Sequence, residues 1–181
     1  MAPRCGVAQI QAYIYGGQAN ITPIVMRTLE GFQIASPGTR FVLVAARFNA
    51  LVVEPLIRGA EDALLRHGVS GEDITLVRVP GAWEIPWACR HVAASGKADA
   101  IVALGAVVRG ATPHFDYVAS EVAKGVSQVS ASTGVIISFG VLTTDTMDQA
   151  LERAGGKAGN KGADAALVAL EMVSLRAVLG A

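Results

Sequence analysis

The chain has 181 residues, a length that predicts one domain with a short appendage. Its 15 basic and 15 acidic residues cancel to a net charge of +0, which excludes the strongly basic surface typical of nucleic-acid-binding proteins. Charged residues make up only 17% of the chain, against 52% hydrophobic residues and a mean hydropathy of +0.44. A chain so poor in charge is expected to cover part of its surface with copies of itself, as a homo-oligomer.

The two cysteines, Cys5 and Cys89, are too few for a disulfide framework or a four-cysteine zinc site. Cys89 lies among apolar helical positions and is expected to be a small buried side chain. The longest uncharged stretches, residues 5–26 and 125–144, are interrupted by polar residues or glycine, so neither predicts a membrane span. Polar side chains after Arg4 also argue against a signal peptide, and we expect a cytoplasmic protein.

Residues 1–25 follow no clear period and are predicted to be a flexible extension of a domain at 26–181, with Met26 as an alternative start. Beyond them, apolar runs typical of buried strands alternate with helical spacings. The strands are expected at residues 40–46, 73–79, 99–108 and 134–141, and the helices at 51–67, 84–95, 112–130, 145–154 and 163–179, with a Gly-rich loop at 155–162. The alternation predicts a three-layer α/β/α sandwich of flavodoxin-like type, with a four-stranded parallel sheet. Ligands of such folds bind at the carboxyl ends of the strands.

Two side chains after the first predicted strand can contact a flat ligand. Phe48 offers an aromatic ring, and Asn49 beside it offers an amide donor and acceptor. The alternative is that Phe48 packs in the core while Asn49 caps the next helix.

A rigid segment, residues 80–86, follows the second predicted strand. It reads PGAWEIP, and its two prolines and its glycine restrict the backbone of Ala82, Trp83 and Glu84. Its amide groups and the two larger side chains therefore point in defined directions. The alternative is a stiff turn with Trp83 in the core and Glu84 as an acid that favours a helix start.

The segment after the third predicted strand reads RGATPHFD and has the features of an anion site. Thr112 is expected to cap a helix that begins at Pro113. Gly110 and Ala111 leave the backbone N–H groups of that helix end open to an anion. His114 lies in the first turn, where a bound phosphate would favour its protonated form and suit it to proton transfer. The alternative is an ordinary surface histidine near a helix cap.

The last predicted strand contains Phe139, and two cations follow it, Arg153 and Lys161. Singly such cations are most often solvated charges, but in a chain so short of charge two of them flanking a helix end favour an anionic ligand. The Gly-rich loop lacks the ending of a P-loop, and no dinucleotide-binding glycine motif follows the first strand. No metal-ligand cluster or Ser-His-Asp set is evident, so a site for two small substrates, one planar and one phosphorylated, is the best interpretation.

The segments PGAWEIP and RGATPHFD resemble those of lumazine synthases, and further matches run in order from Met26 to Leu179. The resemblance implies condensation of 5-amino-6-(D-ribitylamino)uracil with 3,4-dihydroxy-2-butanone 4-phosphate, the penultimate step of riboflavin biosynthesis. The products are 6,7-dimethyl-8-ribityllumazine, phosphate and water, and neither a metal nor an organic cofactor is used. In this family the amine attacks the ketone to form an imine, phosphate is eliminated, and the ring closes.

The resemblance also implies a role for each candidate residue. His114 would be the proton donor. The pyrimidine and its ribityl chain would contact Phe48, Asn49, Ala82, Trp83, Glu84, Ala106, Val107, Val108, Phe139 and Lys161. The phosphate would contact Gly110, Ala111, Thr112 and Arg153. Trp83 replaces the phenylalanine common in the family, and Ala106 stands where threonine or glycine often does.

The family places its site between adjacent subunits of a pentamer, so Phe139, Arg153 and Lys161 would come from the neighbouring chain. Some members stack pentamers into decamers or icosahedral shells, and riboflavin synthase is a candidate partner. Residues 27–31 resemble the family's first strand, which adds to a neighbour's sheet. Two other interpretations remain open, a protein that binds flavin or lumazine without catalysis and a shell protein whose assembly is its function.

Overall fold

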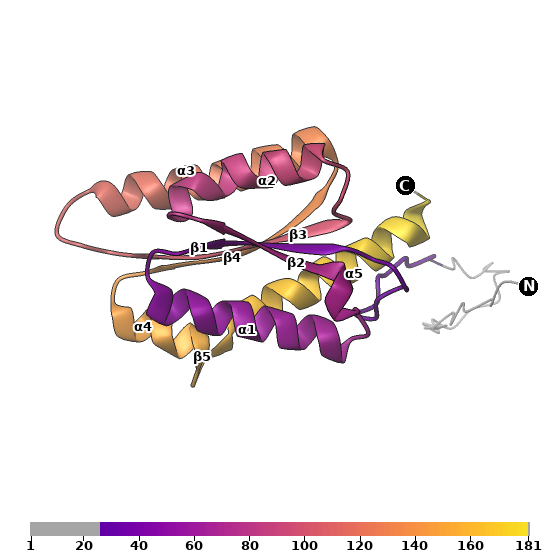
Figure 1. Ribbon diagram of the computed structural model, residues 1–181, viewed down its shortest axis with the longest axis horizontal. Helices are drawn as coiled ribbons and strands as arrows, with labels where there is room; N and C mark the ends of the chain where they lie inside the picture. The colour runs from indigo at the N-terminus through magenta and orange to yellow at the C-terminus, as the bar shows by residue number, and fades with distance from the viewer. Residues whose placement is uncertain (1–25, 181) are drawn as a thin grey trace, which may run out of the picture.

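The computed structural model describes residues 26–180, and its centre is a sheet of four parallel strands (Figure 1). The strands are β1 (Phe41–Ala46), β2 (Ile74–Val79), β3 (Ala100–Val108) and β4 (Ile136–Thr144). They lie side by side in the order β2-β1-β3-β4, so β1 and β3 are central and β2 and β4 are the edges. The predicted extension at 1–25 lies outside the described residues.

Helices cover both faces of this sheet, which confirms the predicted three-layer α/β/α sandwich. In Figure 1, α2 (Ile85–Ala94) and α3 (His114–Thr133) lie above the sheet. The other layer holds α1 (Ala50–Arg66), α4 (Met147–Arg153) and α5 (Lys161–Leu179). Two short 3₁₀ turns, Gly71–Asp73 and Ala82–Glu84, and a small hairpin of β5 (Ala154–Gly156) and β6 (Gly159–Asn160) complete the described elements.

The central strands are apolar throughout because both of their faces are covered. Along β1, Phe41 and Leu43 pack into the core beneath α1 and α5, whereas Val42 and Val44 pack into the core beneath α2 and α3. The edge strand β2 is less covered, and Leu76 is exposed on it. Burial on both faces therefore explains why the central strands could be predicted from continuous apolar runs in the sequence.

Several boundaries differ from those predicted, and three of the differences lie near the candidate residues. The cap predicted at Thr112 is wrong, because α3 begins at His114 and its first backbone hydrogen bond runs from Asp116 N–H to Pro113 O. The last strand continues to Thr144 because it stays paired with β3 to the end. The Gly-rich loop contains the β5–β6 hairpin, and α5 starts at its end, where the Asn160 side chain caps two N–H groups.

The segment that precedes β1 lies along α5 of the same chain. The Phe32 N–H donates to Ser174 Oγ at 3.0 Å, and Gln33 Nε2 donates to Glu171 Oε2 at 3.2 Å. Residues 27–31 form no strand in this chain, so their addition to a neighbour's sheet stays a prediction. Across residues 26–180, no helix combines the length and the apolar composition that a membrane crossing requires.

Candidate active site

The carboxyl ends of β1 and β3 meet at the point where the chain reverses its direction of travel across the sheet. From β1 the chain passes through α1 on one face to β2, and returns through α2 on the opposite face to β3. Crevices at such a point are where open α/β sheets bind ligands. Phe48 and Trp83 stand there with 70% and 56% of their surfaces exposed, so neither ring belongs to the core.

Asn49 connects the two strand ends. Its backbone is left-handed, with φ 58°, and its side chain forms no hydrogen bond to the helix that it precedes. Instead Nδ2 donates to the carbonyl oxygen of Ala106 at 2.9 Å. The pairing of β1 with β3 ends at Ala45, opposite Leu104. The Asn49 amide therefore continues the hydrogen bonding of β3 beyond the point where its pairing with β1 stops. Asn49 therefore occupies the N-cap position of α1, as the alternative predicted, but its side chain does not cap the helix.

Hydrogen bonds fix the turn after β2 against the end of β1. Arg47 N–H donates to Val79 O at 2.8 Å, and Phe48 N–H donates to Pro80 O at 3.0 Å. Glu84 Oε2 accepts the N–H of Gly81 at 2.9 Å, which closes the turn on itself. The carboxylate that sequence reasoning assigned to a ligand thus also holds the backbone that presents Trp83.

The loop between β3 and α3 is open to solvent over every residue from Gly110 to His114. A side chain built at Gly110 would meet no atom within 4 Å, so this approach to the backbone is unobstructed. The first N–H groups of α3 have no partner within the helix, and this end of the helix carries a partial positive charge. The loop, the helix end and His114 thus form one exposed surface suited to an anion.

Arg109, which sequence reasoning did not single out, lies at the start of this loop and contacts residues on both sides of it. Its Nη2 donates to Asp116 Oδ1 at 3.1 Å and its Nε to Asp145 Oδ1 at 3.0 Å, while its guanidinium carbon lies 4.0 Å from the centre of the Phe115 ring. The hydrogen bonds to Asp116 and Asp145 raise the pKa of Arg109 above its ordinary value. Its backbone N–H donates to Thr144 O at 2.9 Å.

The other candidate residues lie in a groove of about 400 Å³ along the outer side of β4. Phe139, Arg153 and Lys161 line it, together with Asp164, which the sequence did not indicate. Arg153 Nη1 donates to Gln149 O at 2.9 Å, and Lys161 Nζ pairs with Asp164 Oδ2 at 2.7 Å. The groove therefore carries one aromatic ring and two cations whose positions are held by neighbouring groups.

The candidate residues thus form two groups within one chain. One group lies at the ends of β1, β2 and β3, and the other lines the β4 groove. Among residues 26–180, no hydrogen bond or ion pair joins a side chain of one group to a side chain of the other, and the β4 groove is lined by the second group alone.

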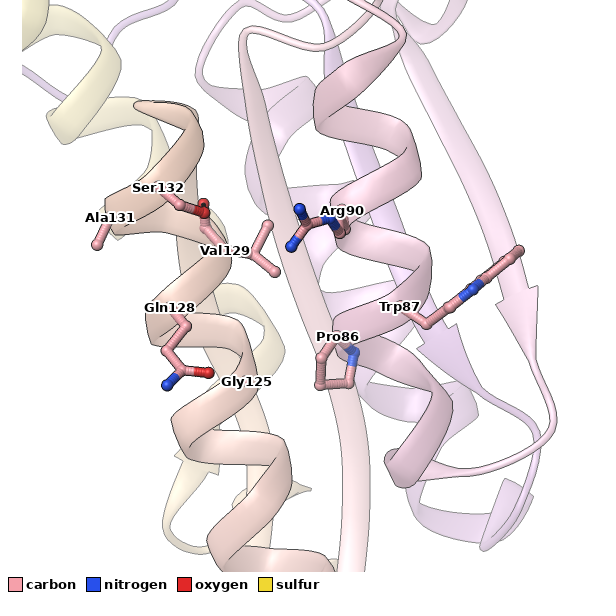
Figure 2. Close-up of a pocket in the computed structure, with 8 residues that line it drawn as sticks. All are labelled: Pro86, Trp87, Arg90, Gly125, Gln128, Val129, Ala131 and Ser132. Atoms are coloured by element: carbon pink, nitrogen blue, oxygen red, sulfur yellow. Dashed lines mark hydrogen bonds between the residues drawn. The ribbon is translucent and has the colours of Figure 1, made fainter.

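A larger hollow, of about 620 Å³, lies between α2 and α3 (Figure 2). Figure 2 shows Arg90 extending from α2 toward α3, and Pro86 and Trp87 also line the hollow from α2. None of the candidate residues lines it, and its walls are mostly apolar. The polar side chains that line it are those of Arg90, Gln128 and Ser132. Within the described part of the chain, no three His, Cys, Asp or Glu side chains are grouped as metal ligands would be.

Comparison with known proteins agrees with this geometry. The family model described as 6,7-dimethyl-8-ribityllumazine synthase matches residues 38–177. A protein of that name from Halorhodospira halophila (strain DSM 244 / SL1) is 58% identical over 150 residues, which cover 83% of this chain and 96% of the relative. The match includes every candidate residue at the ends of β1 to β3 and in the β4 groove. The chain therefore belongs to the 6,7-dimethyl-8-ribityllumazine synthase family.

Proposed function

We propose that this chain condenses 5-amino-6-(D-ribitylamino)uracil with 3,4-dihydroxy-2-butanone 4-phosphate to form 6,7-dimethyl-8-ribityllumazine. Membership of the family supports the reaction. The observation that carries it is the position of His114 at an open helix end after β3, at the same edge of the sheet as the exposed rings of Phe48 and Trp83. That surface combines a place for a flat ring, a place for a phosphate and a proton carrier.

The pyrimidine is held at the β1/β3 end of the site. Phe48 stacks on the ring, and the strand end at Ala106–Val108 contacts its edge through backbone groups. Ala82, Trp83 and Glu84 contact the ribityl chain, with Asn49 nearby. The bonding of the Asn49 amide nitrogen to Ala106 supports this arrangement, because it leaves the side-chain oxygen as the group of Asn49 that can accept from the ligand.

The phosphate of the second substrate is held at the start of α3. Gly110, Ala111 and Thr112 offer backbone N–H groups there, and Arg153 adds a cation. The amine attacks the ketone carbon and one water leaves, giving an imine. The carbon–oxygen bond to phosphate then breaks, and its electron pair leaves with the phosphate. His114 takes up the proton that the imine intermediate loses from carbon and supplies protons to the leaving water and phosphate. The second nitrogen closes the ring with loss of another water, so the reaction balances without an oxidant or reductant.

Most of the rate arises from holding the two substrates together. Effective molarities of well-oriented reactants reach about 10⁵–10⁸ M, whereas a general acid or base contributes typically about 10²–10⁴-fold. His114→Ala is therefore expected to retain slow, measurable turnover. Arg153→Ala should raise the KM for the phosphorylated ketone far more than the KM for the pyrimidine.

The active site is shared between neighbouring subunits of a homopentamer in the cytoplasm. The pentamer either stands alone or is part of a decamer or an icosahedral shell, and riboflavin synthase is a candidate partner. The separation of the candidate residues into two groups supports sharing. Large exposed apolar side chains, among them Trp87 and Tyr117, support association because a monomer would leave them in water. Phe139, Arg153 and Lys161 then complete the crevice of the adjoining chain.

Co-expression of two damaged chains tests both the reaction and the sharing. Lumazine formation is followed by its absorbance and fluorescence for His114→Ala, for Arg153→Ala and for the two co-expressed in equal amounts. Random assembly gives about a quarter of interfaces with both intact halves, so activity should rise toward a quarter of the native value. Phe48→Ala co-expressed with His114→Ala is the matched control, because both lie in the same group and no activity should return.

Two outcomes would contradict the proposal. A native protein that binds lumazine but forms none would be a binding protein or a silent shell. A native protein that turns over while the mixed assembly shows no recovery would carry its whole site within one chain.

A further inference from the structure

We propose that Arg109 is a positioning residue, which holds the phosphate loop and His114 in place without contacting the phosphate. This inference rests on the proposed function, since it concerns the site of that reaction. Residues 110–114 are exposed, and the predicted Thr112 cap is absent. The loop therefore depends on contacts from outside it to hold a fixed shape.

The Arg109 side chain closes the loop across its base. Nη1 and Nη2 donate to Asp116 Oδ2 and Oδ1 at 3.2 and 3.1 Å, a two-pronged contact between residues seven apart in sequence. The planar guanidinium matches a carboxylate in this way, which fixes orientation as well as distance. The Phe115 ring lies against the guanidinium, so the first turn of α3 that contains His114 is held at two adjacent residues.

The same guanidinium connects the loop with the element that carries Arg153. Its Nε donates to Asp145 Oδ1 at 3.0 Å, at the junction of β4 and α4. The Asp145 N–H donates to Gln149 Oε1 at 3.0 Å, and the Gln149 carbonyl accepts from Arg153 at 2.9 Å. Arg109 thus orders the start of α3 directly and the base of α4 through one further residue.

The charges also distinguish positioning from phosphate binding. Two carboxylates surround Arg109, and its Nε, Nη1 and Nη2 all donate to them. This set has a net charge of −1, so it does not attract a dianion. Loss of Arg109 would leave Asp116 uncompensated two residues from His114, where it would repel the phosphate. The Arg109 side chain is 42% exposed and its acids are more so, and such pairs contribute little to folding, so its variants are expected to fold.

The experiment compares Arg109→Gln, Arg109→Lys, Asp116→Asn and Asp145→Asn with native protein in steady-state assays, and measures inhibition by inorganic phosphate. Arg66→Gln is the matched control, because Arg66 also pairs with an exposed acid, Asp62, but lies at the end of α1. Circular dichroism during heating checks that each variant folds.

Arg109→Gln should lower kcat/KM for the phosphorylated ketone by about 10- to 100-fold and weaken phosphate inhibition, with a much smaller effect on the KM for the pyrimidine. The kcat/KM of Arg109→Lys should lie between those of Arg109→Gln and native protein, because an ammonium keeps the charge but lacks the two-pronged contact. Asp116→Asn and Asp145→Asn should each lower the same constant by about twofold to fivefold. In a chain with both acids replaced, Arg109→Gln should add little further loss.

Two results would overturn the inference. Tighter binding of the phosphorylated ketone by Asp116→Asn and Asp145→Asn, with loss only in Arg109→Gln, would mean that Arg109 binds phosphate directly. Arg109 variants that match native protein and Arg66→Gln would mean that the loop needs no such support. Both presuppose an active native protein, so an inactive native protein refutes the proposed function instead.

Discussion

Replacement of Asn49 by alanine should destabilise the fold more than replacement by glycine. The residue has φ 58°, a conformation that costs most residues about 1–2 kcal/mol but costs glycine almost nothing. Both variants lose the 2.9 Å hydrogen bond to Ala106 O, which contributes about 1 kcal/mol and is part-buried. We therefore expect losses of about 2–3 kcal/mol for Asn49→Ala and about 1 kcal/mol for Asn49→Gly.

Urea unfolding at one fixed protein concentration measures both variants, since association contributes to the stability of an oligomer. Ala50→Gly is the control, because the next residue lies in α1 and glycine there should destabilise by up to about 1 kcal/mol. The sign of the Ala–Gly comparison thus reverses between adjacent positions. Equal losses for Asn49→Ala and Asn49→Gly would refute the reasoning, because the left-handed backbone would then carry no cost.

The remaining predictions concern ionisation. Burial raises the pKa of the Cys89 thiol to about 12, so in a Cys5→Ser chain a thiol reagent at mildly alkaline pH should label Cys89 only after denaturant is added. Rapid labelling of that chain when folded would contradict this. Burial opposes ionisation of Asp99, but hydrogen bonds and charge from Arg40 outweigh it and lower the net pKa of Asp99. A carboxyl group whose pKa is lower in the folded than in the unfolded protein stabilises the fold at pH values above its unfolded pKa. This stability is lost as the pH falls through its folded pKa. Asp99→Asn should therefore lower the free energy of unfolding at neutral pH but not in acid below that range, and an equal effect at both would count against the ion pair.

Local patterns predicted the elements whose packing is uniform along their length. The central strands β1 and β3 were evident because cover on both faces demands apolar residues throughout. The last strand was predicted too short because its end, Leu142–Thr144, carries threonines that resemble a loop, yet pairing with β3 extends it. The β5–β6 hairpin was missed because glycines carry no alternation to detect.

The candidate site was predictable where the topology itself decides position. Parallel strands bring their carboxyl ends to one edge, so the positions of Phe48, Trp83 and His114 at that edge were predicted without coordinates. Arg109 was missed because its contact with Asp145 spans 36 positions along the chain, which no local pattern encodes. Asp164 was missed for a different reason, since an acid one turn into a helix is usually only a favourable dipole contact.

The division of the candidate residues into two groups has a kinetic consequence. On the proposed arrangement a lone chain holds two halves of different sites and therefore no working one. Turnover per chain should fall when the enzyme is diluted below the concentration at which subunits associate, and it should return on concentration. Newly made protein would then show a delay before activity appears, and the delay would shorten as the protein concentration rises. The reason is that association of subunits, and not folding of the chain, would be the slow step.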